Sequence, residues 1–577
     1  MHRERSHYFV RGAFRRFFIP AMVSSIWLAV AGVVDSIFVG NRIGAAGLAA
    51  ISFGQPVYLF FNILSYGFSI GGSIHFAAKL AEGREEEANR IFLTVLQLLI
   101  SIYLVTVALG LSFLPQLMRF FGADPTDELT RSYIRTQLIF VPIMFCQGPF
   151  YYFVNADGAP ALAAAAMSVS GAVDTLFSYL FIVVMGLGVR GSVYSTVVGA
   201  VLMLFITGSH ILRKKGALRF VRSRFDRQAV WRSARTGFAT ASQYLFQFIT
   251  LIAVNRLLMR TAGQVAVAAF DVVYNISLLC AAVSDGTSVA IEPMLSSYRS
   301  ERNLGNIRIT LGLALQWAGI LSAVLIVILE MFPKQFSILF GMATAQELLY
   351  VSTGIRIFAL SILPAMVNSI FCVYYQSILR EGFAYLISFL RSFALYLVAL
   401  FLCIRGGMDT FWYVFLLAEG ISLLIWVPVS QLKGGLMQLK SIDTGCVRTA
   451  VIDSSAKDIS AVIRQMQAFC EENGADVKQI MYVGLTIEEL CVAIIDRFRQ
   501  QMGDIYIQVT VVAENGETTF FLRDNAFAFN PLSENTDSID LNGSEGLELI
   551  GLRIVQKKAK EFYYRRYTGF NTMVIRL

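Results

Sequence analysis

Long apolar stretches alternate with short polar ones over most of the chain. From about residue 17 to 431 each apolar stretch has roughly 20 residues, enough for a helix to cross about 30 Å of hydrocarbon. They predict twelve transmembrane spans, over residues 17–38, 46–72, 91–113, 132–153, 162–185, 191–212, 237–258, 266–288, 308–330, 350–373, 383–403 and 410–431. After about residue 440, charged and apolar residues mix as they do in a soluble domain.

The composition supports a membrane protein with a soluble tail. The 577 residues are 56% apolar and 15% charged, against about 45–50% and about 25% in soluble domains. This excludes a wholly soluble enzyme, a disordered chain and a disulfide-stapled secreted protein. The net charge of +8 comes from basic residues that lie mainly at helix ends and in loops. We therefore expect no nucleic-acid partner.

The distribution of positive charge predicts the orientation. An even number of spans puts both termini on one side of the membrane, and Lys and Arg accumulate in cytoplasmic loops. The first 16 residues and the loop over residues 213–236 are the basic stretches, whereas the alternate loops carry little charge. We expect a multi-pass protein of the plasma (cytoplasmic) membrane with both termini in the cytoplasm, and the membrane itself as a partner.

The basic central loop divides the spans into six and six. An offset of 219 residues places Ala49-Ala50 on Ala268-Ala269, a weak sign of an internal repeat. Parallel repeats of this kind are common in secondary transporters. We predict an all-α polytopic protein with a six-helix lobe over residues 1–212, a basic linker over 213–236, a second lobe over 237–435, and an α+β domain over 446–577.

Two carboxylates inside the first six spans are the strongest functional signal. Asp35 lies in the first span and Asp174 in the fifth, and no Lys or Arg lies at similar depth to neutralise them. Ionisable residues in spans usually face a cavity or a partner. Asp174 and Ser178 share a helix face, Thr196 offers another hydroxyl oxygen, and hard cations bind oxygen ligands. The four residues therefore suggest a site for Na⁺, H⁺ or a cationic solute. Alternatively, each acid lies near a helix end or bonds a neighbouring hydroxyl.

The second half carries its own amide and ionisable side chains, Asn255, Asp271, Asp285, Glu292, Arg356 and Arg391. We include Asn255 and Asp285 among the candidate ion- or substrate-binding residues. We expect Asp271 at the extracellular interface and Glu292 solvated near the cytoplasmic end. The two arginines either pair with these acids or extend their side chains to the interface.

Several motifs resemble those of one transporter family. The stretches VVDSIFVGNRIGAAGLAAISFGQP, GFSIGGSIHFAAKLAEG, NADGAPALAAAAM and GLGVRGSVYSTVVGA are similar to multidrug and toxic-compound extrusion (MATE) transporters, and the resemblance covers residues 15–435. It implies a two-lobe bundle that exports cationic or amphipathic compounds in exchange for Na⁺ or H⁺.

The resemblance also implies an ion site. In the family this site uses an aspartate in the first helix, which Asp35 matches. It also uses an Asn and an Asp four residues apart in the fifth helix, and a Thr eighteen residues later. Asp174 stands at the Asn position, Ser178 at the Asp position and Thr196 at the Thr position. The order of acid and neutral ligand is changed, which leaves the choice between Na⁺ and H⁺ open. We expect no metal other than this Na⁺.

The tail resembles another family. Its pattern predicts a strand over residues 446–453, two helices over 456–473 and 477–501, a hairpin over 505–524, a helix over 551–560 and two final strands. This order, with LTIEELCVAIID and FLRDNAFAFNP, resembles the histidine-kinase-like ATPase domain of the anti-sigma-factor type.

The nucleotide motifs of the tail are degenerate. Glu489 matches the first motif of that family, but Ala493 replaces the Asn that holds Mg²⁺. Asp524 matches the adenine-reading Asp, but Ala526 replaces a glycine, and the lid is reduced to SEGLELIG. A methyl group cannot coordinate a metal. We therefore expect no ATP hydrolysis and no bound cofactor, and we interpret the tail as a regulatory module or one that binds a cytoplasmic protein.

Together these features predict a secondary active exporter, not an enzyme, whose substrates are cationic or amphipathic small molecules. One alternative is a lipid-linked sugar flippase, which should line its cavity with several cations for a pyrophosphate. The other is a membrane sensor whose tail binds a signalling partner.

Overall fold

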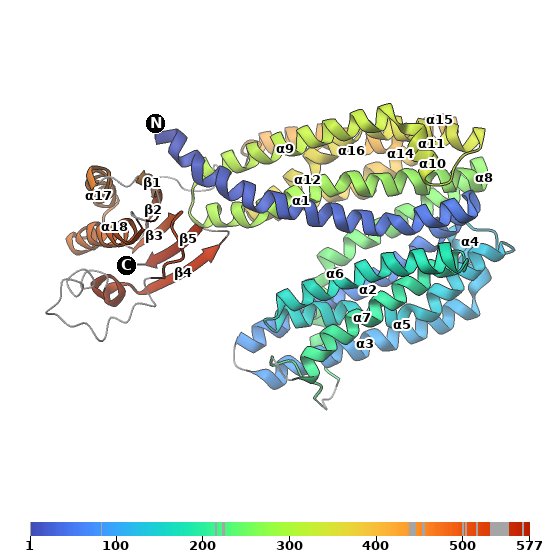
Figure 1. The fold of residues 1–577 in the computed structure, drawn as a ribbon, viewed down its shortest axis with the longest axis horizontal. Coiled ribbons are helices and arrows are strands. Elements are labelled where there is room, and N and C mark those ends of the chain that lie inside the picture. Colours follow the sequence, from blue (N-terminus) through green and yellow to red (C-terminus); the bar gives the residue numbers. More distant parts are fainter. Residues whose placement is uncertain are drawn as a thin grey trace.

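The structure, a computed structural model, describes residues 2–81, 84–213, 216–221, 225–437, 446–452, 456–498, 501, 505–514, 517–530, 553–567 and 570–576. Most of these residues form two bundles of long helices, and a small sheet domain lies beyond one end of the bundles (Figure 1).

The first half of the chain forms α1 (His2–Ile43), α2 (Ala45–Ala81), α3 (Glu85–Ser112), the short α4 (Leu114–Phe121), α5 (Glu128–Ala156), α6 (Pro160–Ser178) and α7 (Val189–Leu212). A π-helical segment, η1 (Tyr179–Val184), extends α6. Local signals set the ends of these helices. The side chain of Asp127 caps α5 by accepting from the Leu129 amide, and Gly122, in the left-handed region, ends α4.

The second half forms α8 (Arg227–Ser300), α9 (Leu304–Met331), α10 (Pro333–Leu339), α11 (Ala345–Ala359), α12 (Ile362–Ser377), α13 (Glu381–Phe389), η2 (Leu390–Ala394), α14 (Leu395–Cys403), η3 (Ile404–Gly406), α15 (Met408–Phe411) and α16 (Tyr413–Leu432). Like η1, η2 is π-helical. A capping box between Thr344 and Glu347 begins α11.

The described residues contain ten helices long and apolar enough to cross a membrane, or up to eleven if α11 and α12, bent by 50°, form one span. The spans expected over 237–258 and 266–288 lie in the single helix α8. Gly263, with φ of 75° and ψ of −167°, interrupts that helix between them. The number twelve therefore stays a prediction.

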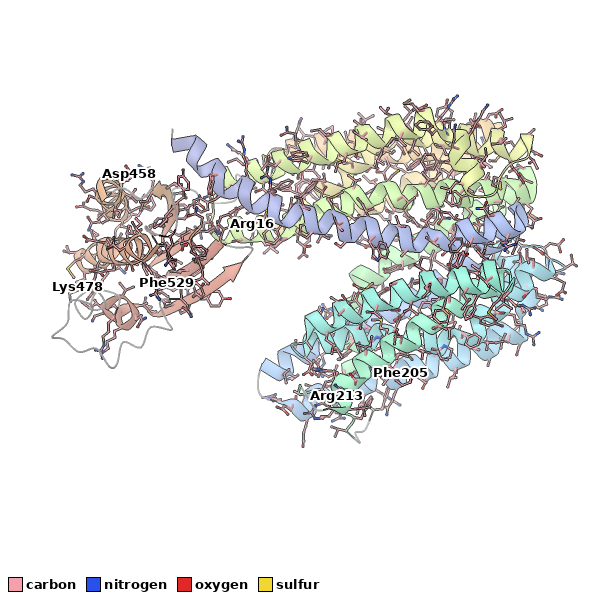
Figure 2. The ribbon with its side chains drawn as sticks, in the orientation of Figure 1. Arg16, Phe205, Arg213, Asp458, Lys478 and Phe529 are labelled. Carbon is pink, nitrogen blue, oxygen red and sulfur yellow. The ribbon has the colours of Figure 1, made fainter. Side chains whose placement is uncertain are left out.

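The two bundles converge near α4 and α10 and diverge towards the sheet domain (Figure 1). Helix α1 contacts both halves. Its early residues Phe9, Phe14 and Phe18 share a core with the end of α8 and with α9, whereas Val33 and Val39 belong to the core that includes the first bundle. On the outer surface, Phe205 of α7 is 72% exposed, as expected for a side chain that faces lipid (Figure 2).

Helix α2 packs closely against the beginning of α8 through small residues. Gly67 and Gly71 of α2 face Ser233 and Gly237, and a Cβ on Gly237 would lie 1.7 Å from the Gly67 carbonyl oxygen. Glycines four residues apart allow membrane helices to approach this closely. The beginning of α8 is thus attached to the first bundle.

The C-terminal domain is a five-stranded sheet in the order β1-β2-β3-β5-β4, with every neighbouring pair antiparallel. The strands are β1 (Val447–Ile452), β2 (Ile507–Glu514), β3 (Glu517–Asp524), β4 (Glu561–Tyr567) and β5 (Phe570–Arg576). Helices α17 (Ala456–Glu472) and α18 (Val477–Phe498) share its core. These elements match the expected ones. The expected lid SEGLELIG lies outside the described residues, and the resemblance to an ATPase domain stays a prediction.

Candidate ion and substrate sites

Asp35 lies where α1 meets α7. Ser192 Oγ donates a hydrogen bond to Asp35 Oδ2 at 2.7 Å, and the Ser178 hydroxyl is also within hydrogen-bonding reach of this carboxylate. Both serines are buried, while Asp35 is half-buried. The helix that carries Asp35 is thus joined to the first bundle through hydroxyl groups.

Asp174 lies on α6, facing α7. Ser195 and Thr196 are beside its carboxylate, and Asp174 Oδ1 is buried without a hydrogen-bond partner among the described residues. Gly199 permits the close approach of the two helices, since a Cβ there would lie 2.8 Å from the Ser170 carbonyl oxygen. An acceptor oxygen is therefore left available in a tightly packed site.

A ladder of hydroxyl groups connects the two acids. Ser178 Oγ and Ser195 Oγ are 2.7 Å apart, and Ser195 in turn donates to the Ser192 carbonyl oxygen at 2.7 Å. Thr196 donates to the same carbonyl at 3.1 Å. The structure thus brings together all four residues predicted in the first half, Asp35, Asp174, Ser178 and Thr196.

The sequence analysis missed Ser192 and Ser195. Their spacing with Thr196 was the available signal, because residues i, i+3 and i+4 share a helix face. The charges of Asp35 and Asp174 are close enough to repel each other. No Lys or Arg within the described ranges forms an ion pair with either. A cluster of two carboxylates and several hydroxyl oxygens suits a hard cation or protons.

The other predicted residues lie outside this cluster. The amide of Asn255 bonds Ser52 in both directions, donating to its carbonyl oxygen at 2.8 Å and accepting from its hydroxyl at 3.1 Å. This pair joins α8 to α2. Asp285 is exposed on α8 and attracts Arg391 of the second bundle. The structure therefore associates Asp285 with a second polar site.

Asp271, which the sequence analysis expected at the extracellular interface, is buried among the helices. It is 1% exposed and accepts hydrogen bonds from Ser36 at 3.3 Å and Asn275 at 3.0 Å. This burial depends on the packing of α1 against α8, which hydropathy does not report, and the depth of Asp271 in the membrane stays a prediction. Glu292 is exposed, as expected.

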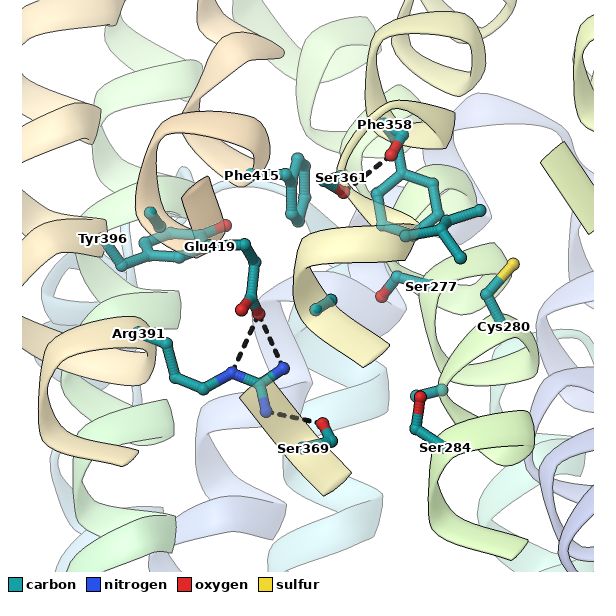
Figure 3. Close-up of a pocket in the computed structure, with 14 residues that line it drawn as sticks. Ser277, Cys280, Ser284, Phe358, Ser361, Ser369, Arg391, Tyr396, Phe415 and Glu419 are labelled. Atoms are coloured by element: carbon teal, nitrogen blue, oxygen red, sulfur yellow. Dashed lines mark hydrogen bonds and ion pairs between the residues drawn. The ribbon is translucent and has the colours of Figure 1, made fainter. Parts of the chain in front are cut away.

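A cavity of about 150 Å³ lies inside the second bundle beside an ion pair (Figure 3). Arg391 of η2 donates to Glu419 Oε1 of α16 from Nε at 2.9 Å and from Nη2 at 2.6 Å, and its Nη1 donates to Ser369 at 2.6 Å. The aromatic side chains of Phe358, Tyr396 and Phe415 also line the cavity. Arg391 thus pairs with an acid that was not among the candidates, although Glu419 is the one acid in the twelfth predicted span.

The ion pair belongs to a wider network. Asn368 donates to Glu419 Oε2 at 2.7 Å and accepts from Trp426 Nε1 at 2.7 Å. Arg391 lies within the π-helical η2, and Ser178 directly precedes the π-helical η1. Each π segment falls in the fifth predicted span of its half, and such segments are frequent at functional sites.

In the C-terminal domain, Asp524 at the end of β3 is fully buried. Its Oδ1 accepts from the Ala526 amide at 2.9 Å and from Asn571 Nδ2 at 2.7 Å. Glu489 lies on α18, where burial, and then the charge of Glu488, raise its pKa. Ala493, one turn further, packs against the domain core.

The domain docks on the ends of α1 and α8. Arg523 of β3 pairs with Glu301, and the two side chains are 11% and 2% exposed. The Arg523 guanidinium also lies 5.2 Å from the centre of the Tyr298 ring. Arg16 of α1 lies over the ring of Phe570, 4.7 Å from its centre. Figure 2 shows Arg16 where α1 reaches the sheet domain. A cavity of about 400 Å³ remains at this junction.

Comparison with known proteins identifies the membrane part. The sequence profile of the MatE family matches residues 20–180 and 236–402. The chain belongs to the MATE family. It is therefore a multi-pass membrane transporter and not an enzyme, and the MATE resemblance expected from the sequence is confirmed.

Its relatives agree with this assignment. The MATE chain is 24% identical over 348 residues to "Probable multidrug resistance protein YoeA" of Bacillus subtilis (strain 168), covering 58% of this chain and 74% of that protein. An inward-facing multidrug resistance MATE transporter matches 74% of this chain and 99% of its own, with a TM-score of 0.64 and 17% identity. The MATE multidrug transporter DinF-BH, solved as a complex, covers 74% of this chain and 96% of its own, with a TM-score of 0.58 and 21% identity.

Proposed function

We propose that this MATE protein exports cationic or amphipathic small molecules across the plasma membrane in exchange for Na⁺ or H⁺. The observation that carries the proposal is the pair of half-buried acids, Asp35 and Asp174, without a cationic partner in the described part of the chain. Asp174 Oδ1, an acceptor without a partner there, supports a site that takes up a cation.

Charge accounting explains how such a site drives export. An entering Na⁺ or H⁺ neutralises a carboxylate, and one elementary charge that moves through 100 mV supplies about 2.3 kcal/mol. Because the bound ion removes negative charge, a cationic substrate held by the same acids loses affinity. Movement of one bundle against the other then changes the side of the membrane from which the ion and substrate sites can be reached.

The proposal includes twelve spans with both termini in the cytoplasm. The apolar part of α8, Ala241–Arg299, has 59 residues, and as one straight helix it would be roughly 90 Å long. This is about three times the thickness of the hydrocarbon core. The interruption at Gly263 supports two spans within α8, which, with α11 and α12 as one span, makes twelve.

The cavity beside Arg391 is the candidate site for the organic part of the substrate. Arg391 and Glu419 line the cavity together with three aromatic side chains, and Asp285 is within electrostatic reach of Arg391. The three ionisable groups carry a net charge of −1 when ionised. A planar cation with an apolar body matches both features, because cations are attracted to aromatic faces. The description of DinF-BH as a multidrug transporter is compatible with organic cargo of this kind.

Efflux of a fluorescent organic cation from cells tests the proposal. We expect Asp35→Asn and Asp174→Asn each to lower efflux at least tenfold, because an amide cannot be neutralised by an ion. Asp157→Asn is the matched control: Asp157 is a buried acid that already has a partner, His210, at 2.9 Å. In Asp157→Asn, efflux should still depend on Na⁺ or H⁺ as it does in the unmodified chain. Unchanged efflux in both Asp35→Asn and Asp174→Asn would refute the ion site.

We also propose that the C-terminal domain regulates transport without nucleotide. Its buried pair with Glu301 at the end of α8 supports a mechanical link to the transport helices. Ala493 in the place of a Mg²⁺ ligand supports the absence of ATP chemistry. A cytoplasmic protein is the proposed partner of the domain.

A further inference from the structure

Helix α1 carries two consecutive polar residues that contact different halves of the molecule. Asp35 accepts from Ser192 of α7, in the first bundle. Ser36 donates to Asp271 of α8 at 3.3 Å. Consecutive residues of an α-helix point about 100° apart, so one turn of α1 lies between the ion-site cluster and α8.

Asp271 is held in a closed hydrogen-bond triangle. Asn275 Nδ2 donates to Asp271 Oδ2 at 3.0 Å and to Ser36 Oγ at 3.1 Å, while Ser36 donates to the same Oδ2. All three residues are at most 5% exposed. No Lys or Arg in the described ranges pairs with Asp271. Burial of a polar side chain is costly, so packing alone does not account for a hydrogen-bond acceptor here.

Tyr133 of α5 connects the triangle to the ion-site cluster. Its side chain lies within electrostatic reach of Asp35 and of Asp271, and it hydrogen-bonds Ser192. Gly54 of α2 leaves room for it, because a Cβ there would lie 2.2 Å from the ring. The titratable groups that face Asp271 are thus Tyr133 and Tyr274, with Asp35 beyond Tyr133.

We propose that Asp271 is a positioning residue that couples ion binding at Asp35 to movement of the bundles, acting through Ser36. This inference rests on the proposed ion exchange. An ion at Asp35 changes how α1 is held by α7, and the bond between Ser36 and Asp271 transmits that change to α8. A ligand shifts a conformational equilibrium only through interactions that differ between the two states, and this bond supplies such an interaction.

The test separates ion binding from movement in the full chain. Spin labels on a ketone-bearing amino acid placed at positions 212 and 432 avoid the seven native cysteines and report the distance between the ends of α7 and α16. Leu212 and Leu432 are 76% and 88% exposed. Na⁺ or proton binding to the purified protein is measured in parallel by calorimetry. In Asp271→Ala and Ser36→Ala we expect ion affinity within about twofold of the unmodified chain, but at least half of the ion-driven distance change to be lost.

A double-mutant cycle identifies the route. The variant with both Ser36→Ala and Asp271→Ala should lose no more of the ion-driven distance change than either single variant. The effects of substituting two contacting residues that act together are not additive. Asp271→Asn keeps an acceptor for Ser36 and should restore most of the movement. Thr287→Ala is the control: it removes a buried hydroxyl that donates to the Val283 carbonyl oxygen of the same helix, and the ion-driven distance change should be normal.

Three outcomes overturn the inference: additive effects in the cycle, an Asp271→Asn variant as defective as Asp271→Ala, or normal movement in both single variants. If the unmodified chain binds the ion and moves but Asp271→Ala also moves normally, this inference fails and the exporter proposal stands. If Asp35→Asn binds the ion as well as the unmodified chain does, the ion site at Asp35 fails, and the coupling with it.

Discussion

At the residue scale, the ion-site cluster depends on hydroxyl groups as much as on its two acids. Ser178, Ser192 and Ser195 are all buried and hydrogen-bonded. Buried polar groups need such partners, because water cannot replace a bond that is lost. The serines therefore fix where the carboxylate oxygens point before any ion arrives.

Ser192→Ala should change ion binding more than it destabilises the fold. It removes the 2.7 Å bond to Asp35, and a hydrogen bond to a charged group contributes about 1.5–3 kcal/mol. If the ion is Na⁺, we expect the concentration for half-maximal efflux to rise roughly tenfold or more. If it is H⁺, half-maximal efflux should shift to higher pH, because the lost bond stabilised the ionised carboxylate; transport at varied Na⁺ and pH measures both. Ser209→Ala, on the same helix and bonded to the Ile206 carbonyl, should leave that concentration unchanged. Equal shifts in the two variants would contradict a specific role for Ser192.

At the element scale, the break in α8 depends on one glycine. Gly263 has φ of 75° and ψ of −167°, a conformation that only glycine adopts readily. Nothing lies within 4 Å of the position of its Cβ. The constraint at Gly263 is therefore conformational and does not arise from lack of space.

Gly263→Ala should destabilise the protein by about 1–3 kcal/mol through backbone strain. The matched control is Gly312→Ala in α9, where a Cβ also meets nothing within 4 Å and the backbone is helical. That change should be neutral or slightly stabilising. Thermal unfolding in detergent compares the two. A Gly263→Ala protein as stable as Gly312→Ala would mean that the break is not set by the glycine.

The helices could be predicted from the sequence where they depend on the hydropathy of neighbouring residues. The predicted spans coincide with described helices because hydropathy reports the sequence neighbourhood of each residue. The sequence analysis left residues 259–265 between two spans, whereas the structure has one helix there with a single non-helical residue, Gly263. Hydropathy does not report such a residue. The pair Arg391 and Glu419, 28 residues apart in sequence, and the bond from Ser36 to Asp271, 235 residues apart, depend on tertiary packing that no local pattern contains.

At the scale of the whole molecule, the C-terminal domain is joined to the second bundle and to α1 at the end where the bundles diverge (Figure 1). Val451 and Phe570 of the sheet share a core with Phe9 and Met294 of the helices. The pair of Arg523 with Glu301 lies at the edge of that core. If the two bundles approach each other at this end, the docked domain therefore has to move together with α1 and α8 or detach from them.

Arg523→Ala should undock the domain, because it leaves Glu301, 2% exposed, as a buried charge without its cation. Removal of one partner of a buried pair typically costs about 3–5 kcal/mol. Hydrogen exchange of residues 8–18 and 570–576 measures the undocking. The second variant, Arg523→Ala with Glu301→Gln, should recover part of the loss because no buried charge then remains. Lys560→Ala breaks an exposed pair with Glu517, where both side chains are more than half exposed, and should change exchange very little.

The same variants predict the direction of regulation. Docking ties α1 to the end of α8 where the bundles diverge, so it favours the arrangement that is open on that side. Release of the domain should lower the free energy of closure and raise the efflux rate of an organic cation roughly fivefold, the lower end of typical coupling between sites. Lys560→Ala should transport at the unmodified rate. If exchange rises in Arg523→Ala while efflux falls, the domain assists transport instead of restraining it; if efflux does not change, docking and transport are independent.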